Sequence, residues 1–150
     1  MIAKVKDVLF GKAAFVLSVL WISVLVLIQL WPASWWMEVQ SVHVADTKAG
    51  DPVVMHVQRE IHRDFSGTWG VSVRVMDAGK GFVACSASAI SGYKEGADLP
   101  DTLTLSWWTN GHCNTLPVGV YIVQTVWQVH GNGILPAKTI TATSNLFKVY

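Results

Sequence analysis

An uncharged stretch near the N-terminus constrains this chain more than any other feature. No Asp, Glu, Lys or Arg occurs between Ala13 and Met37, and the segment Ala13–Trp31 has no polar residue other than two serines and one glutamine. Nineteen helical residues, at a rise of about 1.5 Å each, span roughly 28 Å, which is close to the roughly 30 Å hydrocarbon core of a bilayer. The segment therefore predicts a transmembrane helix over residues 13–31.

Two other interpretations of this segment are open. It could be a buried core helix, although such helices rarely stay apolar on every face over this length. It could also be a cleaved signal peptide, but the only small-residue site, Pro32-Ala33-Ser34, places proline or tryptophan at the upstream recognition position. We favour a retained signal anchor.

The residues that flank the stretch predict its orientation. Three lysines and one aspartate precede it, and the first charge after it is Glu38. The positive-inside rule then predicts a cytoplasmic segment over residues 1–12 and a periplasmic or extracellular domain over residues 37–150. Residues 32–36 form an interfacial linker, because Pro32 disfavours further helix. An aromatic belt is expected at the outer interface, made of Trp31, Trp35 and Trp36.

Composition argues against several functional classes. After residue 37 the chain has eight basic and nine acidic residues and no basic run, so nucleic-acid binding is not expected. No nucleophile elbow, phosphate loop, nucleotide fingerprint or zinc-protease motif occurs. We expect no enzyme activity and no cofactor.

The pattern of apolar residues predicts a mainly β outer domain. After Trp36 the apolar residues alternate, and turn residues separate the alternating runs. In the second run, Val53, Met55, Val57 and Ile61 share one face. Seven strands are predicted, at about Met37–Ala45, Pro52–His62, Thr68–Met76, Phe82–Ser88, Thr102–Trp108, Val118–His130 and Lys138–Val149, with a connection over Ser91–Asp101 and turns at 77–81 and 131–136. Seven short strands in this length favour a two-sheet antiparallel sandwich.

One motif sharpens this expectation. The run Leu116-Pro117-Val118-Gly119-Val120-Tyr121 leads into the sixth predicted strand. It resembles the tyrosine corner of immunoglobulin-like and fibronectin type III domains, and Trp69 is placed like their core tryptophan. The resemblance implies a seven-stranded immunoglobulin-like sandwich in which the hydroxyl of Tyr121 bonds to nearby backbone and Gly119 permits the turn. It implies no activity.

Cys85 and Cys113 are the two cysteines, and both lie in the presumed outer domain. In an oxidising compartment two cysteines commonly pair. Separate buried thiols are the alternative. The immunoglobulin disulfide joins the second and sixth strands, so a Cys85–Cys113 bridge would be a departure from that family.

Histidines are the candidates for a metal site. His56 and His62 share the polar face of one predicted strand, and His43 lies on a possible neighbouring strand. Because the ends of the His56–His62 segment are about 20 Å apart at roughly 3.3 Å per residue, the two cannot share one metal unless the strand bends. A copper or zinc site is conceivable here, and solvated surface histidines are the alternative.

Trp107 and Trp108 are the candidates for partner binding. Strand alternation would bury one and expose the other, and the exposed ring would lie beside Asn110 and His112. Tryptophan is favoured where proteins bind one another. A second candidate is the edge of the last predicted strand, with its threonines at 139, 141 and 143.

These features together predict a membrane-anchored, non-enzymatic interaction or assembly module. Its expected partners are the lipid bilayer, through residues 13–31, and another protein, through the outer domain. An accessory subunit of an envelope complex and a phage or prophage envelope or virion protein both fit this description. The alternative function is periplasmic copper or zinc binding and delivery.

Overall fold

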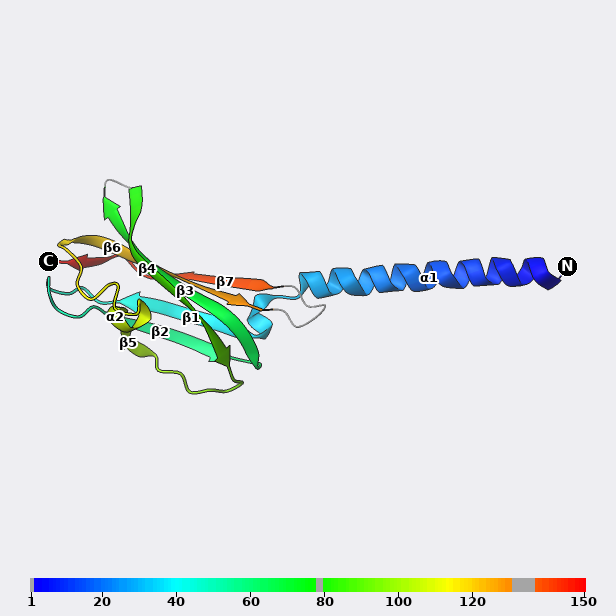
Figure 1. Ribbon diagram of the computed structural model, residues 1–150, viewed down its shortest axis with the longest axis horizontal. Helices are drawn as coiled ribbons and strands as arrows, with labels where there is room; N and C mark the ends of the chain where they lie inside the picture. Colours follow the sequence, from blue (N-terminus) through cyan, green and yellow to red (C-terminus); the bar gives the residue numbers. More distant parts are fainter. Residues whose placement is uncertain (1, 78–79, 131–136) are drawn as a thin grey trace.

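The computed structural model describes residues 2–77, 80–130 and 137–150, and Figure 1 shows one long helix leading into a β-rich domain. The helix, α1, runs over Ile2–Leu30. Its part Lys12–Leu30 is long and apolar enough to cross a membrane, and none of that part is buried. The interpretation as a buried core helix is therefore contradicted.

The helix ends at Leu30, one residue before the predicted end at Trp31. Pro32 precedes a single 3-10 turn, η1, over Ala33–Trp35, in which the N–H of Trp36 donates to the carbonyl of Ala33 at 3.1 Å. Proline has no N–H to continue the helical ladder, which accounts for the break. The first strand begins directly afterwards, at Met37.

Two antiparallel sheets make up the domain, which is compatible with a β-sandwich. A three-stranded sheet has the order β1-β2-β5, and a five-stranded sheet has the order β4-β3-β6-β7, with β8 also paired to β6. The bounds are β1 Met37–Val44, β2 Val54–Ile61, β3 Phe65–Asp77, β4 Lys80–Tyr93, β5 Thr102–Thr104, β6 Gly119–Val129, β7 Lys138–Thr143 and β8 Phe147–Val149.

The number of strands is eight, not the predicted seven. The last predicted strand divides into β7 and β8, and both halves pair with β6. The residues between them bond elsewhere: the side chain of Asn145 accepts from the N–H of Val44 and donates to its carbonyl, both at 2.9 Å. The hydroxyl of Ser144 accepts from the N–H of Val123 at 2.9 Å. These bonds fix a bend where a continuous strand was expected.

The predicted strand over Thr102–Trp108 is also wrong in its second half. Only Thr102–Thr104 is strand, and Leu105–Trp108 forms a short helix, α2. The hydroxyl of Thr104 accepts from the N–H of Trp107 at 3.2 Å, which is the bond made by a helix N-cap. The alternation of Leu103, Leu105 and Trp107 therefore does not describe one face of a strand.

Strands β3 and β4 are longer than predicted. The predicted connection Ser91–Asp101 begins inside β4, which continues to Tyr93. The turn predicted over 131–136 and part of the turn predicted over 77–81 lie outside the described residues.

The core lies between the two sheets and follows the predicted alternation. The apolar face of β2 is buried, and so is the face of β6 that begins with Tyr121. Residues of both sheets join in one buried cluster, listed here by its largest fully buried side chains: Trp127, Tyr121, Phe147, Met37, Met55 and Leu105.

Tyr121 makes a hydrogen bond to nearby backbone, as the resemblance to a tyrosine corner implies. The hydroxyl of Tyr121 donates to the carbonyl of Pro117 at 2.8 Å. A Cβ added at Gly119 would come within 3.2 Å of the Tyr121 ring, so glycine allows the ring to lie against the chain at this point.

We expect Tyr121→Phe to lower the free energy of unfolding by about 1 kcal/mol, because it removes this hydrogen bond and leaves the carbonyl of Pro117 without it. Urea unfolding followed by circular dichroism measures the change. Tyr150→Phe is the matched control, since Tyr150 is exposed at the C-terminal end. Equal midpoints for the two variants would contradict a stabilising role for the corner.

Candidate functional site

An open groove follows the free edge of β4. It has a volume of about 520 Å³, and we call it the edge groove. Its lining residues are Trp69, Ala87, Ser88, Ala89, Ser106, Trp107, Asn110 and Gly111. Because Ala87, Ser88 and Ala89 are consecutive residues whose side chains alternate between faces, the groove wraps the edge of the strand.

A second hollow of about 260 Å³ continues from the first. We call it the Arg59 pocket, and it lies where the two sheets part between β4 and the segment around β5. Its lining residues are Arg59, Trp69, Ser91, Gly92, Tyr93, Leu99, Pro100, Trp107, Trp108 and Trp127. Trp69 and Trp107 line both hollows, so the two adjoin each other.

Helix α2 decides which of the two adjacent tryptophans is exposed. Successive helical residues point about 100° apart, so the rings cannot share a direction. Trp108 is 3% exposed and belongs to the core, whereas Trp107 is 55% exposed and forms the groove wall. The rings meet edge to face with centroids 5.3 Å apart, a favourable aromatic geometry.

The segment after α2 is held rigidly. The hydroxyl of Thr109 donates to the carbonyl of Leu105 at 2.8 Å and accepts from the N–H of Cys113 at 2.9 Å. Asn110 and Gly111 have φ of 49° and 83°, and this left-handed pair reverses the chain at the rim of the groove. Asn110 thus lines the groove as a member of a tight turn.

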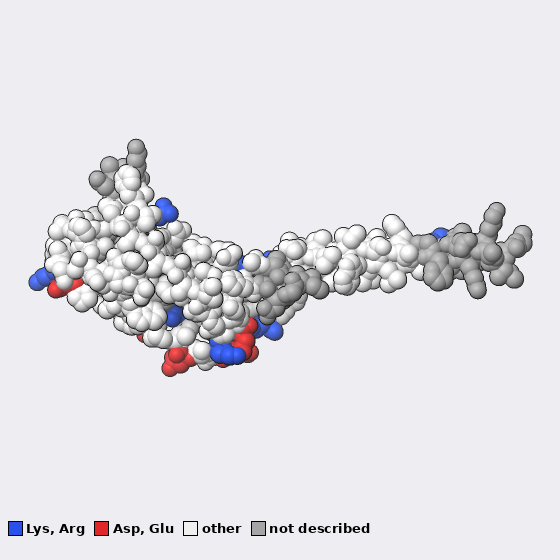
Figure 2. All heavy atoms as spheres, in the orientation of Figure 1, with Lys and Arg blue, Asp and Glu red and all other residues white. Residues whose placement is uncertain are grey.

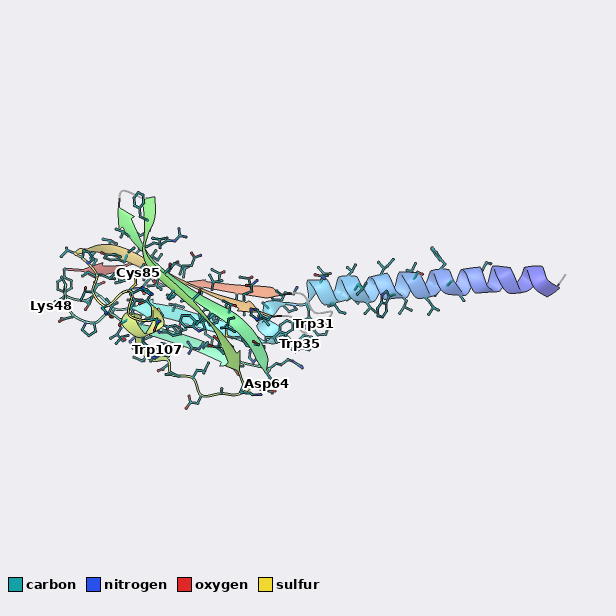
Figure 3. All side chains as sticks on the ribbon, in the orientation of Figure 1. Trp31, Trp35, Lys48, Asp64, Cys85 and Trp107 are labelled. Carbon is teal, nitrogen blue, oxygen red and sulfur yellow. A yellow bond between two sulfur atoms is a disulfide. The ribbon has the colours of Figure 1, made fainter. Side chains whose placement is uncertain are left out.

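Cys85 and Cys113 form a disulfide, with Cα atoms 6.1 Å apart. Cys85 lies on β4 and Cys113 lies in the segment after α2, so the bridge ties the edge strand to the wall that carries Trp107. Figure 3 shows Cys85 and Trp107 in the same part of the domain, well away from Trp31 and Trp35. The predicted pairing therefore falls beside the site.

Arg59 is the site residue that the sequence analysis missed. It lies on β2 between Val57 and Ile61, on the face that is otherwise apolar. A signal was present, because the period of two that identifies Val53, Met55 and Val57 as core residues places position 59 inside as well. Charged residues are almost never fully buried unless they are paired, so an arginine on a core face calls for a partner.

The guanidinium of Arg59 is incompletely bonded. It lies over the ring of Trp108, with Cζ 5.0 Å from the centroid, and Nη2 donates to the carbonyl of Pro100 over a long 3.4 Å. Its Nε and Nη1 are buried, and so is Nε1 of Trp108; none of the three has a hydrogen-bond partner in the part of the chain that the structure describes. Each buried donor without a partner lowers the free energy of unfolding by roughly 1–3 kcal/mol, and by more when the group is charged.

The charge of Arg59 has no ion-pair partner within 4 Å among the described residues, whose ion pairs all involve His62 or Lys94. Burial lowers the pKa of Arg59, and burial raises the pKa of the neighbouring Tyr93, which the nearby guanidinium partly offsets. Asp98 and Asp101 lie on the neighbouring surface without forming an ion pair with Arg59. The pocket is therefore lined by aromatic rings and by one cation, and two carboxylates lie on the adjoining surface.

The free edge of β4 is long and almost uncharged. Its 14 residues include one charged residue, Lys80 at the start, and no proline. In the described part of the chain β4 pairs with β3 alone. Ile90 is 72% exposed and Phe82 is 64% exposed. Natural proteins usually protect such edges with charge, proline or a cover. Figure 2 shows charged residues mainly along the lower rim of the domain, with others at its left end and on its upper side.

The other predicted candidates are scattered. His112 is exposed and is not among the lining residues of the groove. His43 and His56 are cross-strand neighbours with ring centroids 6.5 Å apart, while His62 lies beyond the other end of β2, 3.9 Å from Glu38 and 3.8 Å from Glu60. The three predicted ligands are not brought together, and the described residues hold no cluster of three or more metal-ligating side chains.

Aromatic rings gather where α1 joins the domain. The rings of Trp31 and Trp35 have centroids 3.5 Å apart, and the guanidinium of Arg63 lies over Trp35 at 4.3 Å. Together with Trp36 these residues line a hollow of about 150 Å³. Figure 3 places Trp31 and Trp35 at the junction itself. Trp, Tyr and Arg are residues that suit a bilayer interface.

Comparisons with protein families, with characterised proteins and with solved structures find no match for this chain. The arrangement of its own residues is therefore the basis for a functional proposal.

We expect Cys85→Ser/Cys113→Ser to destabilise the domain by roughly 3–4 kcal/mol, because the bridge closes a loop of 28 residues. Unfolding by urea, with and without reducing agent, measures this. Reduction should destabilise the wild-type chain and leave the double variant unchanged. A wild-type chain that reacts fully with a thiol reagent before reduction would show that the bridge does not form.

Proposed function

We propose that this chain is a membrane-anchored, non-enzymatic interaction module whose edge groove binds an extended segment of another protein. The observation that carries the proposal is the exposed ring of Trp107 beside the nearly uncharged edge of β4, which no other described strand pairs. Strand addition supplies main-chain hydrogen bonds along such an edge, and adjacent hollows receive alternate side chains of the added strand.

The proposed domain is an immunoglobulin-like sandwich. The tyrosine corner opens β6, as in that family. Constant-type immunoglobulin domains place the fourth strand beside the fifth, whereas here β4 pairs with β3. That difference puts β4 at the edge of the larger sheet, beside α2.

The proposed anchor is α1, with its N-terminus in the cytoplasm and the domain outside. Three observations support it: the apolar length of Lys12–Leu30, the basic residues before it and the aromatic cluster after it. A disulfide is expected in an oxidising compartment, which agrees with an outside domain. Such a module suits an accessory subunit of an envelope complex or a phage protein that acts in the envelope.

Binding to the groove should depend on Trp107 and on the β4 edge. We expect Trp107→Ser to weaken binding of the co-purifying protein by roughly 30-fold or more, the equivalent of about 2 kcal/mol for a buried hot-spot tryptophan. Ile90→Lys should weaken it as well, because charge on an edge strand opposes pairing. The measurement is mild-detergent purification of the tagged full-length chain, followed by quantitative mass spectrometry of its companions.

Two matched variants control for general surface effects. Leu146→Ser removes an apolar side chain of similar exposure, 57%, elsewhere on the domain. Thr141→Lys adds a charge on β7 at the other side of the five-stranded sheet. Both should retain the companion, and amide hydrogen exchange along β4 should slow in the complex. Loss of the companion in all four variants, or unchanged exchange along β4, would contradict strand addition.

Topology has a separate test. An amine reagent that does not cross membranes, added to spheroplasts, should modify exposed lysines of the domain, such as Lys48, Lys94 and Lys148, and should leave Lys4 and Lys6 unmodified. Peptide mass spectrometry reads the sites, and lysed cells provide the fully labelled control. Modification of Lys4 and Lys6 alone would reverse the proposed orientation.

A further inference from the structure

We propose that the Arg59 pocket binds a carboxylate carried on an apolar end of the partner segment, so that the segment lies along the edge groove and its acid group pairs with Arg59. The inference rests on the proposed function, since it names the chemistry of the group that the groove receives. The residues concerned are Arg59 and the aromatic rings around it.

The unused hydrogen-bond donors of Arg59 and Trp108 favour a ligand that accepts hydrogen bonds. Nε and Nη1 of Arg59 and Nε1 of Trp108 are buried and have no hydrogen-bond partner among the described residues, and both residues line one pocket. A carboxylate is an acceptor with two oxygens, and guanidinium binds it with two parallel hydrogen bonds. Such a pair of bonds comes from Nη2 together with either Nε or Nη1, so a carboxylate that reaches the guanidinium would give a partner to one of the two nitrogens that the described residues leave unpaired.

The positive charge of Arg59 favours an anionic ligand. Arg59 is half-buried, and a cation taken partly out of water without an anion is unfavourable, so a partner that brings the anion reduces that cost. The bond from Nη2 to the carbonyl of Pro100 is long, at 3.4 Å, so the guanidinium can turn toward a stronger acceptor at little loss. A neutral or cationic ligand would leave the charge of Arg59 uncompensated.

The size and lining of the Arg59 pocket favour an apolar group beside the acid. A dry cavity of about 150 Å³ holds benzene, so a pocket of about 260 Å³ has room for an aromatic or branched side chain together with a carboxylate. The walls include the rings of Trp69, Tyr93, Trp108 and Trp127. These walls favour an apolar side chain, while Arg59 favours a carboxylate over a neutral group.

The Arg59 pocket adjoins the edge groove. Trp69 and Trp107 line both the Arg59 pocket and the edge groove. A strand added to β4 can therefore place one terminal group in the pocket without leaving the edge. This continuity makes a protein segment the expected occupant, with free small acids as the other outcome of the test.

The experiment compares matched acids and amides on the full-length wild-type chain in nanodiscs. The small probes are 3-phenylpropionate and 3-phenylpropanamide. The peptide probes are one six-residue Val/Thr peptide ending in phenylalanine, with either a free C-terminal carboxylate or a C-terminal amide. Since the chain has three arginines, the Nε–H resonances of Arg59, Arg63 and Arg74 report directly on where each probe binds.

We expect both acids to shift the Arg59 resonance and to bind roughly tenfold or more tightly than their amides, as one charge-assisted pair requires. The peptide acid should bind more tightly than the small acid, because it also uses the groove. A small acid that binds as tightly as the peptide would show a small-molecule site instead. Equal affinity for acid and amide, or no shift at Arg59, would overturn the inference.

Arg59→Met separates a binding role from a structural one. It keeps the length of the side chain but removes the charge, so the acid should lose its advantage over the amide while the melting temperature stays equal or rises. A large fall in melting temperature would show that Arg59 holds the fold, and would overturn the inference. The acid and amide comparison on the wild-type chain does not depend on this variant folding.

The outcomes also distinguish this inference from the proposed function. A companion protein that is lost in Trp107→Ser and Ile90→Lys, together with equal binding of acids and amides, would leave strand addition in place and refute only the role of Arg59. Binding of the small acid with no companion protein and no peptide preference would refute the protein segment as the occupant.

Discussion

The difference in side-chain size between the central strand β6 and the edge strand β4 of the larger sheet shapes the functional side of this domain. The inner face of β6 carries large residues such as Tyr121 and Trp127, whereas the inner face of β4 carries Cys85, Ala87 and Ala89. Small side chains cannot fill the roughly 10 Å between packed sheets. Other groups must occupy that space, and protein interiors tolerate few voids.

Helix α2 supplies much of the missing volume. Trp108 enters the core from α2, and Trp69 meets it edge to face with centroids 5.7 Å apart. The disulfide between Cys85 and Cys113 then ties β4 to this insertion. Because one helical turn cannot fill the whole gap, the edge groove and the Arg59 pocket remain open beside it. The proposed binding surface is thus a consequence of how the core is completed.

The position of the groove suits a tethered module. The aromatic cluster at the end of α1 sits where the proposed bilayer interface would lie, and Trp107 is well removed from it (Figure 3). An anchor of this kind restricts where the domain can move, which raises the effective concentration of any partner held in the same membrane. Weak strand addition would then be sufficient for stable association.

Features that depend on local pattern could be predicted from the order of the amino acids. These are the apolar helix, the mainly β character of the rest and the inward faces of β2 and β6, because hydrophobic periodicity is read directly from neighbouring residues. The Tyr121 motif and the cysteine pair were also found in this way, and the structure gives both the expected bonds.

Tertiary structure decided the rest. The alternation of Leu103, Leu105 and Trp107 fits a strand locally, but capping by Thr104 and the gap beside β4 make this segment a helix instead. The division between β7 and β8 depends on bonds from Asn145 to Val44, 101 residues away in the chain. Arg59 could be placed on the inner face from its position, yet its lack of an anion depends on what the folded chain brings near it. Long-range packing sets these outcomes, and a local pattern does not contain it.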